Sequence, residues 1–455
     1  MAGGGPWVAW IGDDFTGSAA VMEVLAFAGL PAVLFTDVPD VALLQRFAGV
    51  RGLGIATTLR SQTPAEMRAV LPRLAAWLGA QGAPLLHYKI CSTFDSAPEM
   101  GSIGCATEVL LEARRARAAL MLTAAPVMRR YQAFGHLFAG MAEGVFRLDR
   151  HPVMARHPVT PMAEADLLRH LAQQTDLPGG LISLEHLAGG GQDRLEALVA
   201  GGARVLSVDA VDGGSEAAAG RLIWENRETM PVVVGSQGVE YALVRHWRAE
   251  ALIGPAPEAG SAGAVAQMVA VSGSVSPVTA GQLDWAGAHG FARIGFDAAA
   301  VCGPEDRLAA EEARVVALAV QAASEGASPL VHSAAGLDDP GVARFRAALS
   351  GSGLETGEAN RRIGAALGRV LDRVLAATGL RRAVISGGDT SGYGMRALGL
   401  QALVALAPTV PGAALCRAYG AGRHDGLEIA LKGGQMGTED YFGWIRAGGG
   451  PRPSG

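Results

Sequence analysis

Three segments rich in glycine and hydroxyl residues lie in the second half of the sequence, and each follows an apolar run typical of a buried strand. They span residues 272–279, 386–391 and 432–437. A strand that turns directly into a helix points several backbone N–H groups, and the positive end of the helix, at one place. Glycine at such a turn lets a phosphate approach the backbone without meeting a Cβ atom. Any one segment is a weak signal, but the three together predict a nucleotide phosphate site.

Lysine is rare in this chain, which has 38 lysine and arginine residues of which only Lys89 and Lys432 are lysines. Both fall in segments dense in glycine, serine and threonine, at the expected ends of strands. A compact ammonium group often binds phosphate or carboxylate, and arginine does not replace it freely. The alternative is that both lysines persist by chance near solvent.

Two adjacent carboxylates, Asp13 and Asp14, follow the first expected strand, Val8–Ile11, before a helix expected over about residues 18–28. In open α/β sheets this edge binds ligands. Carboxylates there could accept hydrogen bonds from sugar hydroxyls, and one could deprotonate an attacking hydroxyl. The alternative is that acidic residues stand here because they favour the start of a helix.

Residues 150–161 combine two arginines and two histidines with several prolines, ahead of an expected helix. Side chains such as Arg150 and His151 could bind a carboxylate or another sugar-acid oxygen, although a solvated loop without a role fits the pattern equally well. The prolines exclude a His-x₃-His helix, so we expect no metal site built by the protein there. Asp389, the acidic residue of the 386–391 turn, could coordinate Mg²⁺ or position the phosphoryl acceptor, or it could simply cap its helix.

Length and composition exclude several classes of protein. A chain of 455 residues is too long for one typical domain, so we expect two. The net charge of −5 gives no electrostatic footprint for nucleic acid or for an anionic membrane. Four scattered cysteines without a CxxC pair argue against a zinc site or a disulfide framework and favour a reducing cytoplasm. We expect no signal peptide and no membrane-spanning run.

Short apolar runs alternate with helical patterns throughout, which predicts an α/β protein with two doubly wound, mostly parallel-sheet domains joined by a Gly/Pro/Ala linker. We expect the two domains over residues 1–250 and 266–443, with a linker over 251–265 and a flexible tail over 444–455. A capping box at residues 63–66 should start a helix that ends near residue 79. Expected strands beyond the first cover residues 33–35, 52–57, 84–90, 118–122, 181–184, 205–208, 232–234, 266–272, 293–296, 330–333 and 383–386, before a strand-rich part over 403–431.

Taken in order, these segments resemble the motifs of the four-carbon acid sugar kinase family over most of the chain. The matching segments are residues 13–17 (Asp-Asp-x-Thr-Gly), 89–96 (Lys-x-Asp-Ser-Thr), 272–279 (Gly-Ser-x-Ser-x-x-Thr), 386–390 (Gly-Gly-Asp-Thr) and 432–437 (Lys-x-Gly-x-x-Gly). Each motif is modest by itself, but their order and spacing are specific. Kinases of this family act on sugar acids of the threonate, erythronate and 3-oxo-tetronate type.

The resemblance implies an N-terminal domain that binds a sugar acid and a C-terminal domain that binds ATP with Mg²⁺. Transfer to a terminal hydroxyl would then proceed by positioning and charge stabilisation. The candidate nucleotide-binding residues are Ser272, Ser274, Gly387, Gly388, Asp389, Thr390, Gly433 and Gly434. The candidate substrate-binding residues are Asp13, Asp14, Lys89, Ser92, Thr93 and Asp95, with Arg150 and His151 added from the 150–161 loop. The candidate catalytic residues are Asp14, Asp389 and Lys432.

The partner that we expect is a small-molecule sugar acid, without nucleic acid or membrane, in a cytoplasmic enzyme of carbohydrate catabolism. The oligomeric state stays open, a homodimer included. Two other functions compete with the kinase. An NAD-dependent oxidoreductase is disfavoured because no GxGxxG fingerprint with a following acidic residue occurs, and the Walker pattern is absent as well. A non-catalytic regulator that binds a sugar acid would use the same residues.

One segment departs from the family pattern. Cys91 replaces the aspartate of the motif that begins at Lys89, and residues 94–96 read Phe-Asp-Ser where the family usually has Leu-Arg-Gly. An anion at Asp95 in place of a cation should weaken the binding of a carboxylate unless a basic residue such as Arg150 compensates. We therefore expect a variant substrate, such as the branched 3-oxo-isoapionate, rather than threonate or erythronate.

Overall fold

The computed structural model describes residues 4–141, 143–156 and 160–452, except for the side chain of Asp389. The chain forms two compact units, Met1–Pro257 and Glu258–Gly455. Each unit is an α/β structure built on its own set of mostly parallel strands, which confirms the predicted fold class. The division between Pro257 and Glu258 falls inside the segment predicted as a linker.

The N-terminal unit contains eight parallel strands among its described residues, in the order β2-β3-β1-β4-β11-β5-β10-β9. These strands are β1 (Val8–Gly12), β2 (Ala32–Phe35), β3 (Gly52–Ala56), β4 (Leu85–Lys89), β5 (Ala119–Leu122), β9 (Gly179–Ile182), β10 (Val205–Val208) and β11 (Val232–Gly235). The central strands are runs of Val, Ile, Leu and Ala that are buried along their length, as expected for a parallel sheet covered on both faces.

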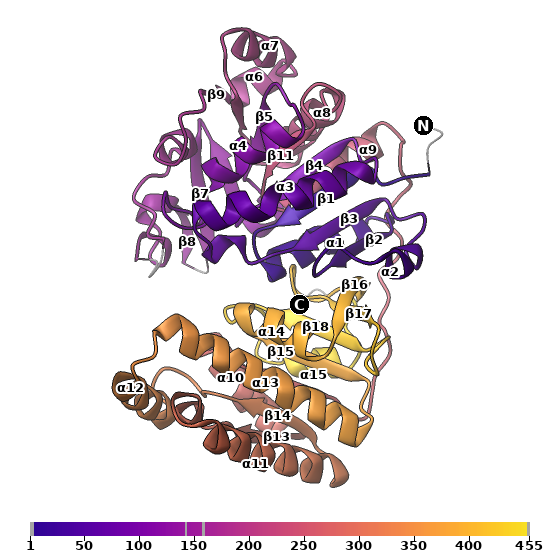
Figure 1. Ribbon diagram of the computed structural model, residues 1–455. Coiled ribbons are helices and arrows are strands. Elements are labelled where there is room, and N and C mark those ends of the chain that lie inside the picture. The colour runs from indigo at the N-terminus through magenta and orange to yellow at the C-terminus, as the bar shows by residue number, and fades with distance from the viewer. Residues whose placement is uncertain (1–3, 142, 157–159, 453–455) are drawn as a thin grey trace. The chain divides into compact units, whose positions relative to one another are not determined.

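Helices cover both faces of this sheet (Figure 1). On one face α3 packs against α4, and on the other α1 and α8 pack against α9. The helices of the unit are α1 (Phe15–Phe27), α2 (Val41–Gln45), α3 (Pro64–Ala80), α4 (Ile103–Ala113), α5 (Leu167–Leu171), α6 (Leu184–Ala188), α7 (Gln192–Ala200), α8 (Gly213–Glu225) and α9 (Gly238–Ala249). The capping box predicted at Thr63 and Glu66 is present at the start of α3.

The close approach of β1 to its neighbours depends on a glycine. The Trp10 side chain is fully buried and donates from its Nε1 atom to the carbonyl of Ser18 at 3.2 Å, which ties the end of β1 to α1. A Cβ atom at Gly54 of the adjacent β3 would overlap the Trp10 ring. This packing fixes the turn between β1 and α1. The helix begins at Phe15, earlier than predicted, because Asp14 caps it.

A small antiparallel sheet was not predicted from the sequence. It consists of β6 (Arg130–Ala133), β7 (His136–Met141) and β8 (Gly144–Arg147). Asp209, which follows β10, holds it to the main sheet by accepting from the backbone N–H groups of Phe134 at 2.6 Å and Gly135 at 3.0 Å. The predicted strand at 181–184 ends at Ile182, because Ser183 caps α6.

The C-terminal unit has seven strands among its described residues, in the order β13-β14-β12-β15-β18-β17-β16, with β17 antiparallel to both of its neighbours. The strands are β12 (Val269–Ser272), β13 (Phe291–Gly295), β14 (Ser328–His332), β15 (Arg382–Ser386), β16 (Leu400–Ala407), β17 (Leu415–Gly420) and β18 (Glu428–Lys432). The helices are α10 (Pro277–Ala288), α11 (Glu305–Ser324), α12 (Pro340–Ser352), α13 (Thr356–Thr378), α14 (Gly388–Ala397) and α15 (Tyr441–Arg446).

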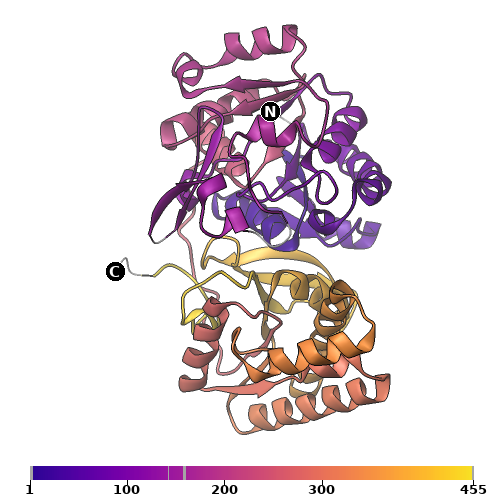
Figure 2. The same cartoon turned by 90° about the vertical axis from the view of Figure 1, so that its left-hand side faces the viewer.

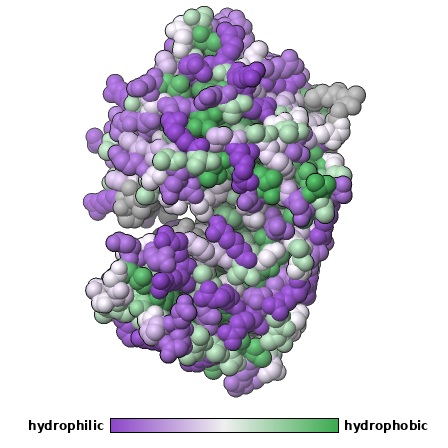
Figure 3. Space-filling model, in the orientation of Figure 1, coloured by the Kyte–Doolittle hydropathy of each residue, from purple (hydrophilic) through white to green (hydrophobic). Residues whose placement is uncertain are grey.

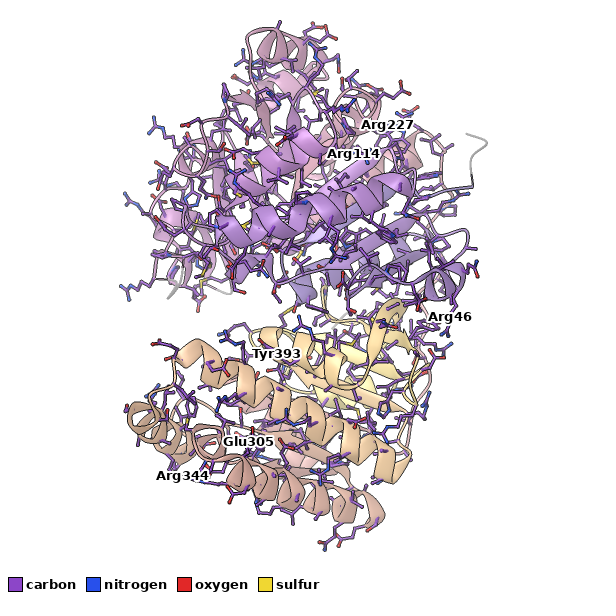
Figure 4. All side chains as sticks on the ribbon, in the orientation of Figure 1. Arg46, Arg114, Arg227, Glu305, Arg344 and Tyr393 are labelled. Atoms are coloured by element: carbon purple, nitrogen blue, oxygen red, sulfur yellow. The ribbon has the colours of Figure 1, made fainter. Side chains whose placement is uncertain are left out.

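One face of this sheet carries α11, α13 and α14, and the other carries α10 and α15. The long helices α11 and α13 lie side by side (Figure 2). Tyr393 of α14 packs over Gly364 of α13, where a Cβ atom would overlap the tyrosine ring (Figure 4). Hydrophilic side chains cover much of the outer surface of α11 and α13 (Figure 3). Arg369 of α13 forms an ion pair at 2.6 Å with Glu312 of α11, which is buried.

Two segments predicted to lie outside the domains bind each other within the C-terminal unit. Ala262 and Val265, from the predicted linker, donate their backbone N–H groups to the carbonyls of Gly448 and Arg446 at 2.8 and 2.9 Å. The domain end predicted at residue 443 falls inside α15. Residues 258–265 and the described part of the predicted tail, 444–452, therefore belong to the structure of this unit, whereas residues 453–455 lie outside the described residues.

Candidate functional site

The three glycine-rich segments of the C-terminal unit begin at neighbouring positions of its sheet. Ser272, Ser386 and Lys432, the last residues of β12, β15 and β18, pair in one register row, and His332 of β14 extends that row. The connection after β12 leads to β13 on one side, whereas the connection after β15 leads to β16 on the other. The two strands therefore flank a topological switch point, where open α/β sheets bind ligands.

Glycine allows the three loops to pack tightly at this edge. A Cβ atom at Gly273 would overlap Thr390 Oγ1, and one at Gly434 would overlap Ser274 Oγ. Gly387 has φ +127°, which side-chain-bearing residues rarely adopt, and it is the N-cap of α14. Its N–H donates to the Lys432 carbonyl at 2.8 Å. These positions need glycine for steric reasons. The same requirement is expected of a loop that brings its backbone N–H groups close to a ligand.

Hydroxyl groups tie the 272–279 loop to the 432–437 loop. Thr279 Oγ1 donates to the Gly434 carbonyl at 2.9 Å, and Ser276 Oγ donates to the same carbonyl. Ser276 also caps α10 by accepting from the N–H of Thr279. Ser274 Oγ accepts from the N–H of Ser276 at 3.2 Å. The loop geometry is thus held by the protein itself, with α10 and α14 both starting at this edge.

Lys432 is fully buried without a carboxylate partner among the described residues. Its Nζ atom donates to the Gly433 carbonyl at 3.1 Å and to Thr279 Oγ1 at 3.5 Å, and it lies 5.9 Å from the centroid of the Tyr441 ring. Desolvation lowers the pKa of Lys432 to about 8. The hydroxyl of Ser386, next to it in the row, is buried and has no partner among the described residues. A bound anion would relieve the desolvation of the ammonium group.

Asp389 occupies the first turn of α14, but its side chain lies outside the described part of the structure. The cap of that helix is Gly387, so the backbone position does not support the alternative in which Asp389 is the N-cap. Gly388 is exposed and nothing would lie within 4 Å of a Cβ atom there, whereas Thr390 is buried. Gly433 is half-buried beside Met436.

In the N-terminal unit, Asp13 follows β1 and is almost completely buried. Both of its carboxylate oxygens accept from Arg60, Oδ1 from Nη2 at 2.7 Å and Oδ2 from Nε at 3.1 Å. Burial raises the pKa of Asp13, a shift opposed by the Arg60 charge and increased by the neighbouring carboxylate of Asp14. With both oxygens occupied, Asp13 fixes Arg60 and is poorly placed to take a proton from a ligand.

Asp14 has a different environment. It is the N-cap of α1, where its Oδ1 atom accepts from the N–H of Gly17 at 2.9 Å and lies 2.9 Å from Arg60 Nη2. Its Oδ2 atom has no partner among the described residues, and its side chain is 27% exposed. The helix-capping alternative is therefore correct for Asp14, yet one oxygen remains available to a ligand.

Lys89, the last residue of β4, is buried beside these carboxylates. Its Nζ atom donates to the Ile90 carbonyl at 2.6 Å. A Cβ atom at Gly17 would lie 2.7 Å from this Nζ atom and would overlap Asp14 Oδ1, so the glycine admits both charged groups to one place. Lys89 and Asp14 are thus close neighbours, contributed by segments about seventy residues apart.

The segment after Lys89 forms a polar chain. The sulfur of Cys91 lies 2.9 Å from Thr93 Oγ1, which donates to Asp95 Oδ1 at 2.7 Å. Burial and the nearby charge of Asp95 raise the pKa of the Cys91 thiol to about 11, so it is neutral at physiological pH. Ser92 lies in the same turn, half-buried.

A basic residue near this polar chain is Arg130 of β6, which the sequence did not single out. Burial lowers the pKa of its guanidinium group, and the charge of Asp95 opposes that shift. Arg150, the residue expected to compensate for Asp95, is exposed and interacts with Asp149 instead. The arginine near Asp95 is instead Arg130, which lies on the antiparallel sheet that the sequence did not predict. His151 is buried close to Arg130, and burial lowers its pKa; residues 157–159 of the same loop lie outside the described residues.

Arg60 and His332 were also absent from the site residues predicted from the sequence. Arg60 follows the apolar run of β3 by four residues, so a search of every strand end for charged side chains would have found it. His332 ends β14 in the same way, and its Nδ1 atom is buried without a partner among the described residues. Arg130 offers no such signal, since it begins its strand rather than following one, in a segment with a second arginine.

Neither a preformed metal cluster nor a membrane-spanning element is found in the described part of the chain. No group of three or more His, Cys, Asp or Glu side chains there could hold a metal ion. No helix there is long and apolar enough to cross a bilayer.

Two family models cover nearly all of the chain. A sugar-binding N-terminal domain matches residues 8–243, and a nucleotide-binding C-terminal domain matches residues 269–442. A 3-oxo-isoapionate kinase from Paraburkholderia graminis is 46% identical over 443 residues, which cover 97% of this chain and 94% of the relative. A 3-oxo-tetronate kinase from Cupriavidus necator is 32% identical over 449 residues, 96% of each chain.

Two solved structures are similar to this chain over nearly its whole length. A Salmonella typhimurium LT2 protein has a TM-score of 0.76 at 28% identity, covering 97% of this chain and 98% of its own. A Haemophilus influenzae protein has a TM-score of 0.72 at 24% identity, covering 96% and 99%, and supports the fold alone.

Proposed function

Since the chain belongs to the four-carbon acid sugar kinase family and is a sugar-acid kinase, we propose that it uses ATP to phosphorylate a terminal hydroxyl of a small, branched or four-carbon sugar acid. The observation that carries the proposal is the register row of Ser272, Ser386 and Lys432. At this row three glycine-rich loops begin, at an edge of the kind where open α/β sheets bind ligands. The row also holds Lys432, whose buried ammonium group has no carboxylate partner in the described C-terminal unit.

The C-terminal loops are suited to a triphosphate. Backbone N–H groups at the starts of α10 and α14 supply partial positive charge, and glycines at 273, 387 and 434 permit close approach. Lys432 would stabilise the charge that develops on the transferred phosphoryl group. Mg²⁺ would enter with the nucleotide, because phosphate oxygens and one or two carboxylates usually hold this ion, and we assign Asp389 as its protein ligand. Bound there, the ion would neutralise phosphate charge.

The N-terminal edge is suited to a polyhydroxy acid. Asp14 offers a free carboxylate oxygen beside the buried ammonium group of Lys89. In the proposed reaction, the substrate hydroxyl oxygen bonds to the γ-phosphorus while the bond from that phosphorus to the bridging oxygen of ADP breaks. The hydroxyl proton passes to Asp14 Oδ2, and ADP leaves with the electron pair of the broken bond.

The substrate that we favour is 3-oxo-isoapionate or a similar branched acid. The relative with 46% identity carries that name, whereas the 3-oxo-tetronate kinases that we compared are less similar. Cys91 is neutral where the family usually has an aspartate, and Asp95 is an acid where it usually has an arginine. Both differences support a different acceptor from threonate. Such a kinase would act in the cytoplasm, in sugar-acid catabolism. Every residue to which we assign a role lies on one chain, so the enzyme could work as a monomer or as a homodimer.

A kinase screen tests the proposal. Purified protein with ATP and Mg²⁺ should release ADP with 3-oxo-isoapionate or a 3-oxo-tetronate, and more slowly with threonate or erythronate. Lys432→Ala should reduce turnover at least about a hundredfold, as should Asp389→Ala, because each removes charge stabilisation at the phosphoryl group. Absence of turnover in the wild type with every acid would overturn the proposal. Calorimetric binding of NAD without binding of ATP would favour the oxidoreductase.

A further inference from the structure

We propose that Arg130 binds the carboxylate of the sugar-acid substrate through its Nε and Nη2 atoms. This inference rests on the proposed function and assigns the acid-recognising residue of the N-terminal unit. Arg130 is the first residue of β6, on the small antiparallel sheet that the sequence did not predict. No carboxylate of the described chain pairs with it.

One nitrogen of Arg130 is fixed by the backbone. Nη1 donates to the carbonyls of Met128 at 3.2 Å, Arg129 at 3.3 Å and Gly140 at 3.1 Å. Three carbonyl acceptors, two from the turn that precedes β6 and one from β7, orient the planar group. Because the guanidinium group is rigid, this also fixes the direction of its opposite edge.

The opposite edge, formed by Nε and Nη2, is the one that several arginines of this chain use for carboxylates. Arg60 binds Asp13 through Nε and Nη2, and Arg147 binds Asp149 through the same two atoms at 2.7 and 2.6 Å. At Arg130 neither atom has a partner among the described residues, and Nε is buried. A buried donor without an acceptor is costly, and a bidentate carboxylate would satisfy both donors at once.

The surroundings of Arg130 favour an external anion over an internal one. Asp95, whose charge acts on Arg130, forms no ion pair with it and accepts from Thr93 instead. His151 lies near Arg130, and its Nδ1 atom accepts from the N–H groups of Val153 and Met154. Neutral His151 therefore carries its proton on Nε2, which has no partner among the described residues and could donate to a second substrate oxygen.

Arg150 supplies a matched control. It lies next to His151 in sequence but is exposed, so its charge should be screened by solvent. If general positive charge in this region attracted the acid, Arg150→Gln and Arg130→Gln would weaken binding similarly. If the fixed edge of Arg130 recognises the carboxylate, only the second variant should matter.

The first experiment measures steady-state kinetics of wild type, Arg130→Gln, Arg130→Lys and Arg150→Gln with 3-oxo-isoapionate and ATP. We expect Arg130→Gln to raise KM for the acid at least about thirtyfold, from the loss of a charge-assisted bidentate contact. KM for ATP should stay within about twofold. Arg130→Lys should restore only part of the loss, because lysine keeps the charge without the two-pronged geometry. A folded Arg130→Gln protein with an unchanged KM for the acid would overturn the inference.

The second experiment does not need turnover. Calorimetric titration of the full chain with erythronate and with erythritol, which lacks the carboxylate, measures discrimination for the acid. Wild type and Arg150→Gln should bind erythronate at least about tenfold more tightly than erythritol, and the Arg130 variants should lose this preference. Equal affinities in the wild type would overturn the inference. Should the wild type bind erythronate through Arg130 but phosphorylate no acid, the proposed function fails and the Arg130 assignment stands. Thermal unfolding of each variant identifies any that does not fold, in which case Arg130→Lys carries the comparison.

Discussion

Asp13 donates its backbone N–H to the carbonyl of Lys89 at 3.0 Å, which joins the ends of β1 and β4. The connection after β1 leads to β2 on one side of the sheet, and the connection after β4 leads to β5 on the other. This contact therefore marks the topological switch point of the N-terminal unit. Two motifs distant in the sequence meet there, which is the position where a ligand of this unit is expected.

Replacing Asp14 should separate catalysis from binding at this edge. We expect Asp14→Asn to lower kcat at least about a hundredfold, because its Oδ2 atom is the free carboxylate oxygen that would accept the hydroxyl proton. KM for ATP should change little. Steady-state kinetics with the best acid from the screen checks this. Asp40→Asn is the control, since Asp40 also caps a helix of this unit, accepting from Leu43 at 2.7 Å, but is exposed. Equal effects of both variants would show that capping, and not proton transfer, explains the loss.

The buried ammonium group of Lys432 predicts that ATP binding depends on pH. Its pKa is lowered to about 8 by desolvation, and a triphosphate nearby should raise it again. Binding then takes up a proton, so affinity for ATP should fall as pH rises above about 8. Calorimetry at pH 8.5 in buffers of different ionisation enthalpy should show uptake of roughly 0.7 proton by the wild type, given the shifted pKa. Lys432→Met should show none, and proton uptake that persists in this variant would contradict the assignment.

The lowered pKa of Lys432 should also make the stability of the protein depend on pH. Between pH 8 and the ordinary lysine pKa of 10.5, the folded nucleotide-free protein binds fewer protons at Lys432 than the unfolded chain does. Its free energy of unfolding should therefore rise with pH across this window. Lys432→Met should remove that rise, which thermal unfolding at several pH values can measure alongside the binding experiment.

A methyl group at Gly434 should force two loops apart. Its Cβ atom would overlap Ser274 Oγ, which belongs to the hydroxyl network of the 272–279 loop. We expect Gly434→Ala to raise KM for ATP at least about tenfold and to destabilise the protein by about 1–3 kcal/mol, as overpacking usually does. Gly422→Ala is the control, because nothing lies within 4 Å of a Cβ atom there. Its ATP kinetics and unfolding midpoint should match those of the wild type, and a Gly434 variant that behaves in the same way would refute the loop model.

The strand ends that build the candidate nucleotide site could be predicted from sequence. The apolar runs that end near residues 272, 386 and 432 are short and each is followed by glycine, so the apolar run and the break both point to a buried strand. Their adjacency in the sheet could not be read from the pattern, because strand order depends on packing between distant segments. Only the resemblance to the family motifs indicated that the three loops bind one nucleotide together.

The acid-binding side could be predicted only in part. Asp13, Asp14 and Lys89 were identified. Arg60, which pairs with the two aspartates, and Arg130, which lies near Asp95, were not. The sheet of β6–β8 has short strands, mixed polarity and half-buried residues, so neither alternation nor an apolar run marks it. Its turn at Gly135, with φ +80°, is the local signal that a hairpin search would have used.

Asp209 should control how firmly Arg130 is held. Its carboxylate accepts from the N–H groups of Phe134, Gly135 and Leu184 and from the side chain of Gln132, which ties the β6–β7 turn to the main sheet. Asp209→Ala leaves these donors without an acceptor, at a cost of about 3 kcal/mol for buried N–H groups. Hydrogen exchange over residues 130–141 should accelerate, because the turn loses its attachment.

The weaker attachment of the β6–β7 turn in Asp209→Ala should also change the steady-state kinetics. In Asp209→Ala, KM for the acid should rise while KM for ATP stays within about twofold, since Arg130 lies on β6 and no residue assigned to the nucleotide belongs to this unit. Asp212→Ala, which removes the exposed N-cap of α8 three residues further along, is the matched control and should leave exchange over 130–141 unchanged. Unaltered exchange in Asp209→Ala would mean that the small sheet is held by other contacts. A raised KM for ATP would mean that the substitution disturbs more than the acid-binding side.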